Sequence, residues 1–241
     1  MIRVSLCLLT FNELPGCRRD VPAIARETFH EVFCIDAHST DGTIEYLEGC
    51  GIPVHRQPRL GLTAAYAYAA EVATGDALVV FFPKGTIPVE SLLEIKVRLE
   101  EGFELVIASR NIVGSRNEED DAWIKPRKWF VLGLGRIVSL LWRREGVRIT
   151  DLLHGVKGFT LRAFEAMHIE PEGQEIDLAM GIRSYKLGLK RCEVPVRERS
   201  RFYGATHFKA LPSGMRLLKF LCGEILGTNR GSAAADRRVN A

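Results

Sequence analysis

An alternation of extended apolar runs with helical patterns constrains the fold more than any other feature of this sequence. Strands are predicted at Ile2 to Leu9, Val32 to Ile35, Ile52 to His55, Ala77 to Phe82 and Leu105 to Ala108. Helical patterns fill the gaps between these runs, at Asp41 to Gly49, Leu62 to Ala73 and Val89 to Glu101. This alternation predicts an α/β fold, in which helices lie on the faces of a mostly parallel sheet.

The loops that follow the predicted strands should share one binding crevice. In open α/β sheets, ligands bind beyond the carboxyl ends of the strands. The relevant loops begin at Thr10, Asp36, Gly61 and Phe82. Topology alone therefore predicts a single site built from these loops.

The second half of the chain is less regular. A polar, acidic link from Gly114 to Asp121 precedes a long helical run, Pro126 to Arg144, and then a loop from Thr150 to Gly158. Two further helices, a strand and a basic segment are expected at Leu161 to Met167, Gln174 to Leu187, Lys190 to Val196 and Arg197 to Lys209. The small, polar tail from Thr228 is expected to be mobile.

Composition excludes several classes of protein. The 241 residues are 46% apolar, which is enough to build a buried core. A formal charge of +3 is too balanced for nucleic-acid binding through bulk electrostatics. The 6 cysteines form no C-x-x-C pair and are expected to be reduced thiols in a cytoplasmic setting. No run approaches the roughly 20 apolar residues of a transmembrane helix, and the N-terminus is typical of a strand rather than a signal peptide.

Motifs of one enzyme family occur in order along this framework. Val4 to Glu13, VSLCLLTFNE, and Ile35 to Thr43, IDAHSTDGT, resemble the opening strand and the nucleotide-binding loop of inverting family 2 glycosyltransferases. Further segments that resemble motifs of this family follow at Gly61 to Tyr66, Leu105 to Arg110, Asp151 to Phe159 and Arg201 to Thr206. Their order and spacing are most similar to the dolichol-phosphate mannose synthase branch, which transfers a sugar from a nucleotide to a polyprenyl phosphate.

The resemblance implies how the chain is divided. A single GT-A domain, with a Rossmann-like nucleotide-binding sheet flanked by helices, is expected over residues 1–227. Residues 1–112 would form the nucleotide-sugar-binding half, and residues 113–227 the acceptor-side half. Residues 228–241 would form the mobile tail.

Thr10, Glu13, Asp36 and Gly61 are the candidate nucleotide-binding residues. An aspartate directly after a buried strand, as Asp36 is, can accept hydrogen bonds from the base or ribose of a nucleotide. A turn-forming role is its alternative. Thr10 and Glu13 resemble nucleotide contacts, although Glu13 could instead organise the turn before Pro15. The preferred nucleotide, GDP or UDP, stays open.

The largest departure from the family lies at the end of the fourth predicted strand. Aligning Pro88-Val89-Glu90 with the family's PPE places Phe82-Pro83-Lys84 on its metal-binding DxD motif. Magnesium and manganese require oxygen ligands, which these three side chains do not supply. No metal or other cofactor is therefore expected.

Two interpretations of Lys84 remain. In the first, its ammonium group replaces the divalent cation and stabilises the departing nucleotide diphosphate. In the second, the protein has lost catalysis and binds nucleotide sugars without transferring them. Lys84 would then be an ordinary turn residue.

Basic residues are expected to hold a phosphate acceptor. Arg110, Arg127, Arg201 and Lys209 lie in segments that resemble the phosphate-contacting segments of the family. The planar fork of arginine suits phosphate, while a solvated surface charge is the alternative for each residue. A phosphate monoester has a second pKa of about 6, so it is largely a dianionic nucleophile near neutral pH and needs no strong general base.

Asp151 resembles the acidic residue that the family places near the reacting centre. A loop or helix-capping role is its alternative. Together with Lys84 and Arg201, Asp151 completes the set of candidate catalytic residues.

Two basic amphipathic stretches are candidates for membrane contact. The first runs from Trp129 to Trp142 and the second from Leu211 to Leu226. Such helices can lie in the membrane interface, although packing on the sheet is the alternative.

The function expected from these features is inverting transfer of a sugar from a GDP- or UDP-linked donor to a lipid phosphate, on the cytoplasmic membrane face. A family 2 transferase for a saccharide or another small acceptor is one alternative. A catalytically silent nucleotide-sugar-binding relative is the other.

Overall fold

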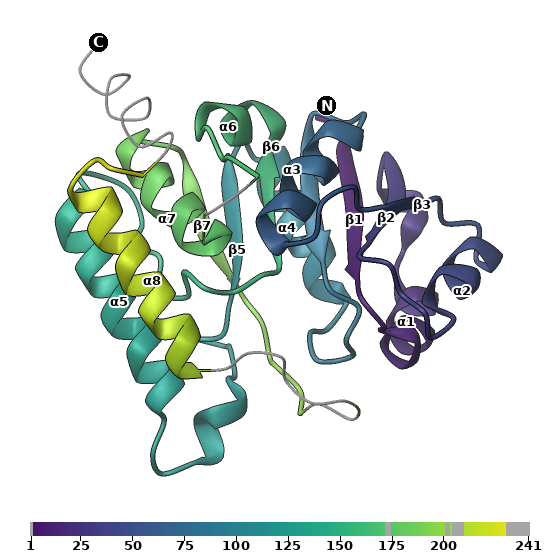
Figure 1. Cartoon of the computed structure of the whole chain (residues 1–241), viewed down its shortest axis with the longest axis horizontal. Helices are drawn as coiled ribbons and strands as arrows, with labels where there is room; N and C mark the ends of the chain where they lie inside the picture. The colour runs from purple at the N-terminus through teal and green to yellow at the C-terminus, as the bar shows by residue number, and fades with distance from the viewer. Residues whose placement is uncertain (1, 172–174, 201–202, 204–209, 230–241) are drawn as a thin grey trace.

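The predicted α/β fold is confirmed by a computed structural model, which describes residues 2–171, 175–200, 203 and 210–229 (Figure 1). Its strands form one 7-stranded sheet in the order β3-β2-β1-β4-β6-β5-β7. They are β1 (Val4–Thr10), β2 (Glu31–Asp36), β3 (Val54–Arg56), β4 (Ala77–Phe81), β5 (Leu105–Ser109), β6 (Lys157–Thr160) and β7 (Arg191–Pro195). Only β6 runs antiparallel to its neighbours, β4 and β5. The carboxyl ends of the other strands therefore meet at one edge.

Helices cover both faces of this sheet. They are α1 (Leu14–Asp20), α2 (Thr43–Gly49), α3 (Leu62–Val72), α4 (Glu90–Glu100), α5 (Pro126–Trp142), α6 (Leu161–Ala166), α7 (Ile176–Lys186) and α8 (Ala210–Ile225). Three short 3-10 turns are η1 (Val21–Ala23), η2 (Arg26–Thr28) and η3 (Glu118–Asp121). The helices α5 and α8 run alongside each other at one end of the molecule, while α1 and α2 lie at the other (Figure 1).

The core forms two layers because side chains of a strand alternate between the faces of the sheet. Cys7 and Leu9 of β1 belong to a cluster with residues of α3, α5, α6, α7 and α8. Leu6 and Leu8 point the other way, into a cluster with residues of α1, α2 and α4. The strand β1 is thus covered on both faces.

Two elements differ from the sequence-based expectation. The prediction of a loop from Thr150 to Gly158 is wrong for its last two residues, because β6 begins at Lys157. Burial between β4 and β5 outweighs the low strand propensity of lysine and glycine. A Cβ at Gly158 would lie 2.5 Å from Ile95 Cγ2, so glycine is needed for α4 to pack here.

The helix α1 was not expected because its sequence, LPGCRRD, contains proline and glycine. Proline is tolerated in the first turn of a helix. Gly16 allows a close approach, since a Cβ there would lie 2.0 Å from the carbonyl oxygen of Pro83. The packing of α1 against the end of β4 therefore depends on this glycine.

Of the tail expected over residues 228–241, Thr228 and Asn229 are described, and residues 230–241 lie outside the described part of the chain. The backbone N–H groups of both residues donate to the carbonyl oxygen of Gly223 in α8, at 2.9 and 3.4 Å. None of the cysteines is paired in a disulfide, and Cys7, Cys17 and Cys34 are buried.

Candidate active site

The carboxylate of Asp36 joins the loops that follow β1 and β2. Thr10 lies opposite Asp36 in the register of these strands, and its Oγ1 donates to Asp36 Oδ2 at 2.5 Å. Ser39 donates to the same carboxylate from its backbone N–H at 2.7 Å and from its hydroxyl at 2.6 Å. Asp36 is fully buried. Three protein donors therefore occupy the carboxylate, and in this structure Asp36 organises the loop.

Residues with left-handed backbone complete this loop system. Asn12 has φ 52° and His38 has φ 65°, and both are residue types that tolerate this conformation. The side chain of Asn12 accepts from the backbone N–H of Thr40 at 2.8 Å, and His38 Nε2 lies 3.0 Å from the carbonyl oxygen of Gln57. The loops after β1, β2 and β3 are thereby linked to one another.

Gly61 lies immediately before α3, at the same edge of the sheet. Its φ of 123° is accessible to glycine alone among common residues. Its carbonyl oxygen accepts from Gln57 Nε2 at 2.7 Å. No protein atom lies within 4 Å of the place that a Cβ would take, so the backbone is open on that side. The nucleotide-binding role of Gly61 stays a prediction.

Lys84 contacts a carboxylate at the end of β4. Its Nζ lies 3.5 Å from Oε1 of Glu13 and 5.4 Å from the centre of the Phe82 ring. Tyr203 OH donates to the other oxygen of Glu13. The turn is fixed by Asp20, whose Oδ2 accepts from the backbone N–H of Gly85 at 2.7 Å. Glu13, expected to contact a nucleotide, therefore holds Lys84 and Tyr203.

These residues do not fit a divalent cation. The turn after β4 contributes an aromatic ring, a proline and an ammonium group, none of which is an oxygen ligand. The adjacent carboxylate of Glu13 is engaged by Lys84 and Tyr203. Within the described ranges, no group of three or more His, Cys, Asp or Glu side chains is arranged to bind a metal.

Asp151 and Arg110 form a buried ion pair beyond the end of β5. Arg110 Nε and Nη2 donate to the two oxygens of Asp151 at 2.8 and 3.0 Å, and the backbone N–H of Arg110 donates at 3.0 Å. Burial opposes ionisation of Asp151, but the charge and hydrogen bonds of Arg110 outweigh it and hold the pKa of Asp151 below its ordinary value. Arg110 also lies 3.5 Å from Glu198. Asp151 is thus an ionised residue that positions Arg110.

The loop around Asp151 is held by hydrogen bonds to β7. Glu193 of β7 accepts from the backbone N–H of Asp151 at 2.9 Å and from Thr150 Oγ1 at 3.0 Å. Burial lowers the pKa of His154 to about 4, and the nearby charge of Arg110 adds to this effect. His154 is therefore neutral near neutral pH.

Lys157 is a buried cation that the sequence analysis did not identify. It lies between Val80 and Ile107 in the sheet, and its Nζ donates to Asp177 Oδ1 at 2.7 Å. Its side chain is fully buried. Asp177 lies in the first turn of α7, so this ion pair fixes the start of α7 against the sheet.

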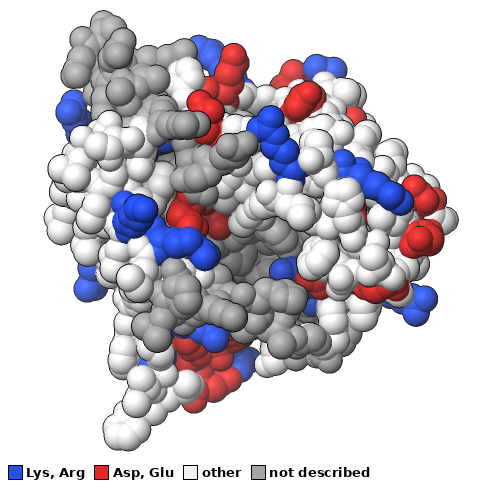
Figure 2. Space-filling view, in the orientation of Figure 1, with Lys and Arg blue, Asp and Glu red and all other residues white. Residues whose placement is uncertain are grey.

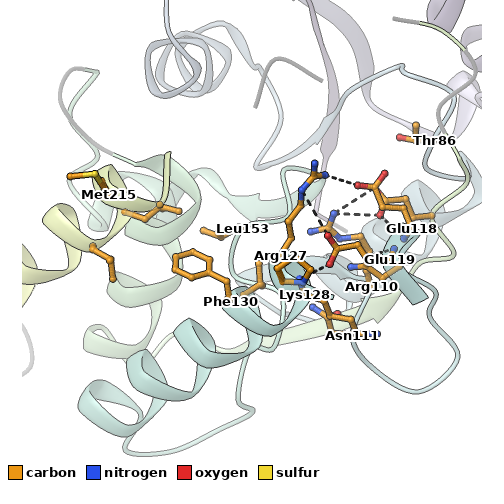
Figure 3. Close-up of a pocket in the computed structure, with 17 residues that line it drawn as sticks. Thr86, Arg110, Asn111, Glu118, Glu119, Arg127, Lys128, Phe130, Leu153 and Met215 are labelled. Atoms are coloured by element: carbon orange, nitrogen blue, oxygen red, sulfur yellow. Dashed lines mark hydrogen bonds and ion pairs between the residues drawn. The ribbon is translucent and has the colours of Figure 1, made fainter. Parts of the chain in front are cut away.

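A cavity of about 920 Å³ lies between α5, α8, η3 and the loop after β5 (Figure 3). One end is polar and is lined by Arg110, Asn111, Asn117, Glu118, Glu119, Arg127, Lys128 and Glu198. The other end is apolar and is lined by Phe130, Val131, Leu153, Met215, Leu217 and Leu218. Acidic and basic side chains are also intermixed on the face of the molecule that Figure 2 shows. The cavity therefore suits a molecule with a charged head and an apolar tail.

The candidate phosphate-binding residues are only partly placed. Arg110 and Arg127 meet at the polar end of the cavity. Arg127 is half exposed, and its Nη1 donates to Glu118 Oε1 at 3.0 Å. Arg201 and Lys209 lie outside the described residues. The carboxylates of Glu118, Glu119 and Glu198 near the arginines were not anticipated, although the acidic composition of the link from Gly114 to Asp121 was a signal for the first two.

The chain matches a family model described as glycosyl transferase family 2 over residues 5–163. It is 27% identical over 199 residues to the glycosyltransferase AglJ of Haloferax volcanii, an alignment that covers 79% of this chain. The chain spans 62% of the length of that relative.

Solved structures of glucosyl-3-phosphoglycerate synthase from Mycobacterium tuberculosis share the fold. The complex with Mn2+, UDP and glucosyl-3-phosphoglycerate gives a TM-score of 0.68 at 14% identity, covering 94% of this chain and 80% of that one. The complex with phosphoglyceric acid gives 0.70 at 15% identity, with the same coverage.

Proposed function

Because the chain belongs to glycosyl transferase family 2, we propose that it transfers a sugar, with inversion, from a nucleotide sugar to a polyprenyl phosphate. The proposed activity is that of the dolichol-phosphate mannose synthase branch, which the order and spacing of the motifs resemble. The donor would bind at the carboxyl ends of β1, β2 and β4, where Thr10, Glu13 and Asp36 lie. The acceptor would bind in the cavity between α5 and α8.

The amphiphilic lining of this cavity is the observation that carries the proposal. Arg110 and Arg127 at the polar end suit a phosphate head, since guanidinium groups bind phosphate through two parallel hydrogen bonds. Phe130, Leu153 and Leu218 at the other end suit an isoprenoid chain. A saccharide would leave this apolar wall without a partner. Arg201 and Lys209 remain proposed contributors to phosphate binding.

The chemistry needs no strong base. An oxygen of the phosphate dianion forms a bond with the anomeric carbon, while the bond from that carbon to the nucleotide diphosphate breaks and the diphosphate leaves with the electron pair. Asp151 and Asp177 are each paired with a cation, Arg110 at 2.8 Å and Lys157 at 2.7 Å. These pairs are consistent with positioning roles. The acceptor phosphate and the nucleotide diphosphate are both anions that must be held close together, so the site needs cations.

Lys84 is proposed to stabilise the departing diphosphate in place of a metal ion. Its ammonium group lies at the end of β4 and contacts Glu13 at 3.5 Å, so it can exchange that carboxylate for a diphosphate oxygen. An ammonium group in a partly dry cleft stabilises the negative charge that develops on the departing diphosphate.

Two alternatives keep specific support. A small phosphorylated acceptor is favoured by the fold shared with structures that bind phosphoglyceric acid. A silent nucleotide-sugar-binding relative is favoured by the contacts that already occupy Glu13, Lys84 and Asp36. The apolar half of the cavity argues against the first alternative. The intact order of the remaining motifs argues against the second.

Peripheral contact with the cytoplasmic membrane face is part of the proposal. Apolar side chains of α5 and α8 are exposed, among them Leu140 at 86% and Met215 at 73%. Helices that carry such residues together with arginine and lysine bind membrane interfaces. No helix among the described residues is long and apolar enough to cross a membrane.

A transfer assay with three acceptors tests the proposal. GDP- and UDP-linked sugars are incubated with the protein, in chelator or in Mg2+, and with a polyprenyl phosphate, the same polyprenol or 3-phosphoglycerate. We expect a glycosylated product with the polyprenyl phosphate alone. Product with 3-phosphoglycerate would establish the small-acceptor alternative. Nucleotide-sugar binding without any product would establish the silent relative.

A further inference from the structure

Basic and acidic side chains balance at the polar end of the cavity between α5 and α8. The lining contains Arg110, Arg127 and Lys128, and also Glu118, Glu119 and Glu198. Their formal charges cancel. An incoming anion therefore meets a neutral lining, although the basic residues alone would attract it.

Glu119 occupies the position that would best suit an anion. Its Oε2 accepts the backbone N–H of Lys128 at 3.0 Å, in the first turn of α5. Unpaired N–H groups and the helix dipole favour negative charge at such a place. Its Oε1 lies 3.8 Å from Arg127 Nε, and its side chain is only 15% exposed. A carboxylate of the protein thus satisfies groups that could hold a phosphate oxygen.

Glu118 neutralises the other side of Arg127. Its Oε1 accepts from Arg127 Nη1 at 3.0 Å, while 43% of its side chain is exposed. The η3 backbone that carries both glutamates is anchored by Asn117, whose side chain caps the turn. Rotation of the glutamate side chains toward solvent would therefore free Arg127 without unfolding η3.

We infer that Glu118 and Glu119 determine which phosphates this site accepts, by acting as an internal anion that a ligand must displace. Every phosphate that binds must displace the same contacts, which Glu118 and Glu119 make with Arg127 and the Lys128 N–H group. A small phosphate gains little beyond replacements for those contacts. A lipid phosphate also buries its chain against the apolar end of the cavity, which adds free energy in proportion to the buried area. The glutamates thus set a threshold that small cellular phosphates do not reach. This inference rests on the proposed acceptor.

Charge-neutral glutamine variants test the inference. Wild type, Glu119→Gln and Glu118→Gln/Glu119→Gln are titrated by calorimetry with inorganic phosphate, glycerol 3-phosphate and farnesyl phosphate. Glutamine keeps the contact with the Lys128 N–H group because its amide oxygen is an acceptor. We expect the double variant to bind all three on the order of tenfold more tightly at low ionic strength. At one fixed concentration, inorganic phosphate should then occupy the double variant to a greater extent than wild type.

Asp121→Asn is the matched control. Asp121 lies in the same turn, but its side chain is 76% exposed, pairs with Arg116 and does not line the cavity. Replacing the Asp121 carboxylate by an amide should leave phosphate binding unchanged. Unchanged or weaker phosphate binding in both glutamine variants, with intact thermal unfolding, would overturn the inference. If wild type and the variants bind inorganic phosphate as expected but none binds farnesyl phosphate, the proposed acceptor fails and the internal anion stands.

Discussion

Lys84 lies where the family resemblance places a metal-binding carboxylate, and its charge contacts Glu13 at 3.5 Å. Lys84 can stabilise a leaving diphosphate only if its ammonium group moves from the Glu13 carboxylate to the diphosphate. The side chain is partly exposed at 31%, so it has room for that movement. The role of Lys84 is therefore open to a direct test in the absence of metal.

Lys84→Ala should lower sugar transfer in chelator by about a hundredfold, because loss of one preorganised group at a developing oxyanion costs on this order. Transfer to polyprenyl phosphate is measured under single-turnover conditions, which separate chemistry from binding. Lys96→Ala is the control, since Lys96 pairs with Glu100 on α4. Wild-type turnover of the Lys84 variant without metal would sink the surrogate-charge proposal.

The burial of His154 predicts that the free energy of unfolding depends on pH. Burial lowers its pKa to about 4 in the folded protein, against about 6.5 in the unfolded chain. A depressed pKa contributes stability that is complete above the unfolded value and is lost as pH falls toward the folded value. Between about pH 7 and about pH 4.5 this loss is on the order of 2.5 kcal/mol.

His154→Gln should remove that contribution, so its free energy of unfolding should fall less than that of wild type over the same range. Urea denaturation at several pH values measures both. Partial burial raises the pKa values of Glu193 and Glu198, which opposes this trend, so the difference between the two proteins is the informative quantity. His30→Gln, at an exposed position, should follow wild type. Parallel curves for His154→Gln and wild type would contradict the prediction.

Residue types could be assigned to the site from the sequence, but their partners could not. Thr10 and Asp36 were placed together because strand ends of a parallel sheet meet. The pairing of Tyr203 with Glu13 spans 190 residues, and that of Lys157 with Asp177 spans 20. No local pattern encodes such contacts. Asp36 consequently looked like a free ligand in the sequence, whereas the fold surrounds it with donors.

Among the elements, α8 is attached by a buried charge cluster. Glu224 is 2% exposed, and its oxygens accept from Arg183 Nη2 at 3.2 Å and Lys186 Nζ at 3.0 Å, both on α7. Asn229 also donates to Glu224 at 3.2 Å. Because α8 forms one wall of the cavity where the acceptor is proposed to bind, this cluster links the stability of α8 to that cavity.

Glu224→Ala should destabilise the protein by about 3–5 kcal/mol, because it leaves buried cations without their carboxylate. Hydrogen exchange should show the loss of protection first in α8. Glu165→Ala, at an exposed position on α6, is the control. Equal protection of α8 in the two variants would rule out this role of Glu224.

Most helices and strands were predictable because they are long enough to show a clear hydrophobic periodicity. The exceptions have physical causes. The strands β1, β4 and β5 are mostly apolar runs of 5 to 7 residues that are buried throughout, and the long helices have clear periodicity. The helix α1 has seven residues with proline and glycine, and its formation depends on packing against the β4 turn. The strand β6 has four residues and exists because two neighbours flank it. Short elements fixed by tertiary contact are not encoded locally.

For the whole molecule, α5 and α8 lie together at one end (Figure 1) and carry several exposed apolar side chains, beside the proposed acceptor cavity. Arg136, Arg216 and Lys219 are exposed on the same two helices. An apolar surface with basic neighbours, next to a cavity for a lipid phosphate, would let the acceptor enter without leaving the bilayer. This arrangement predicts binding to anionic membranes.

Leu140→Glu combined with Met215→Glu should weaken binding to anionic phospholipid vesicles on the order of tenfold, because apolar area is lost and negative charge is added. Co-sedimentation measures the bound fraction. Leu60→Glu is the matched control, since Leu60 is 72% exposed but follows β3, at the other edge of the sheet. Higher salt should weaken wild-type binding, since anionic lipids attract the basic residues. If the double variant binds vesicles as the control does, α5 and α8 do not form the membrane face, and the acceptor must reach the cavity by another path.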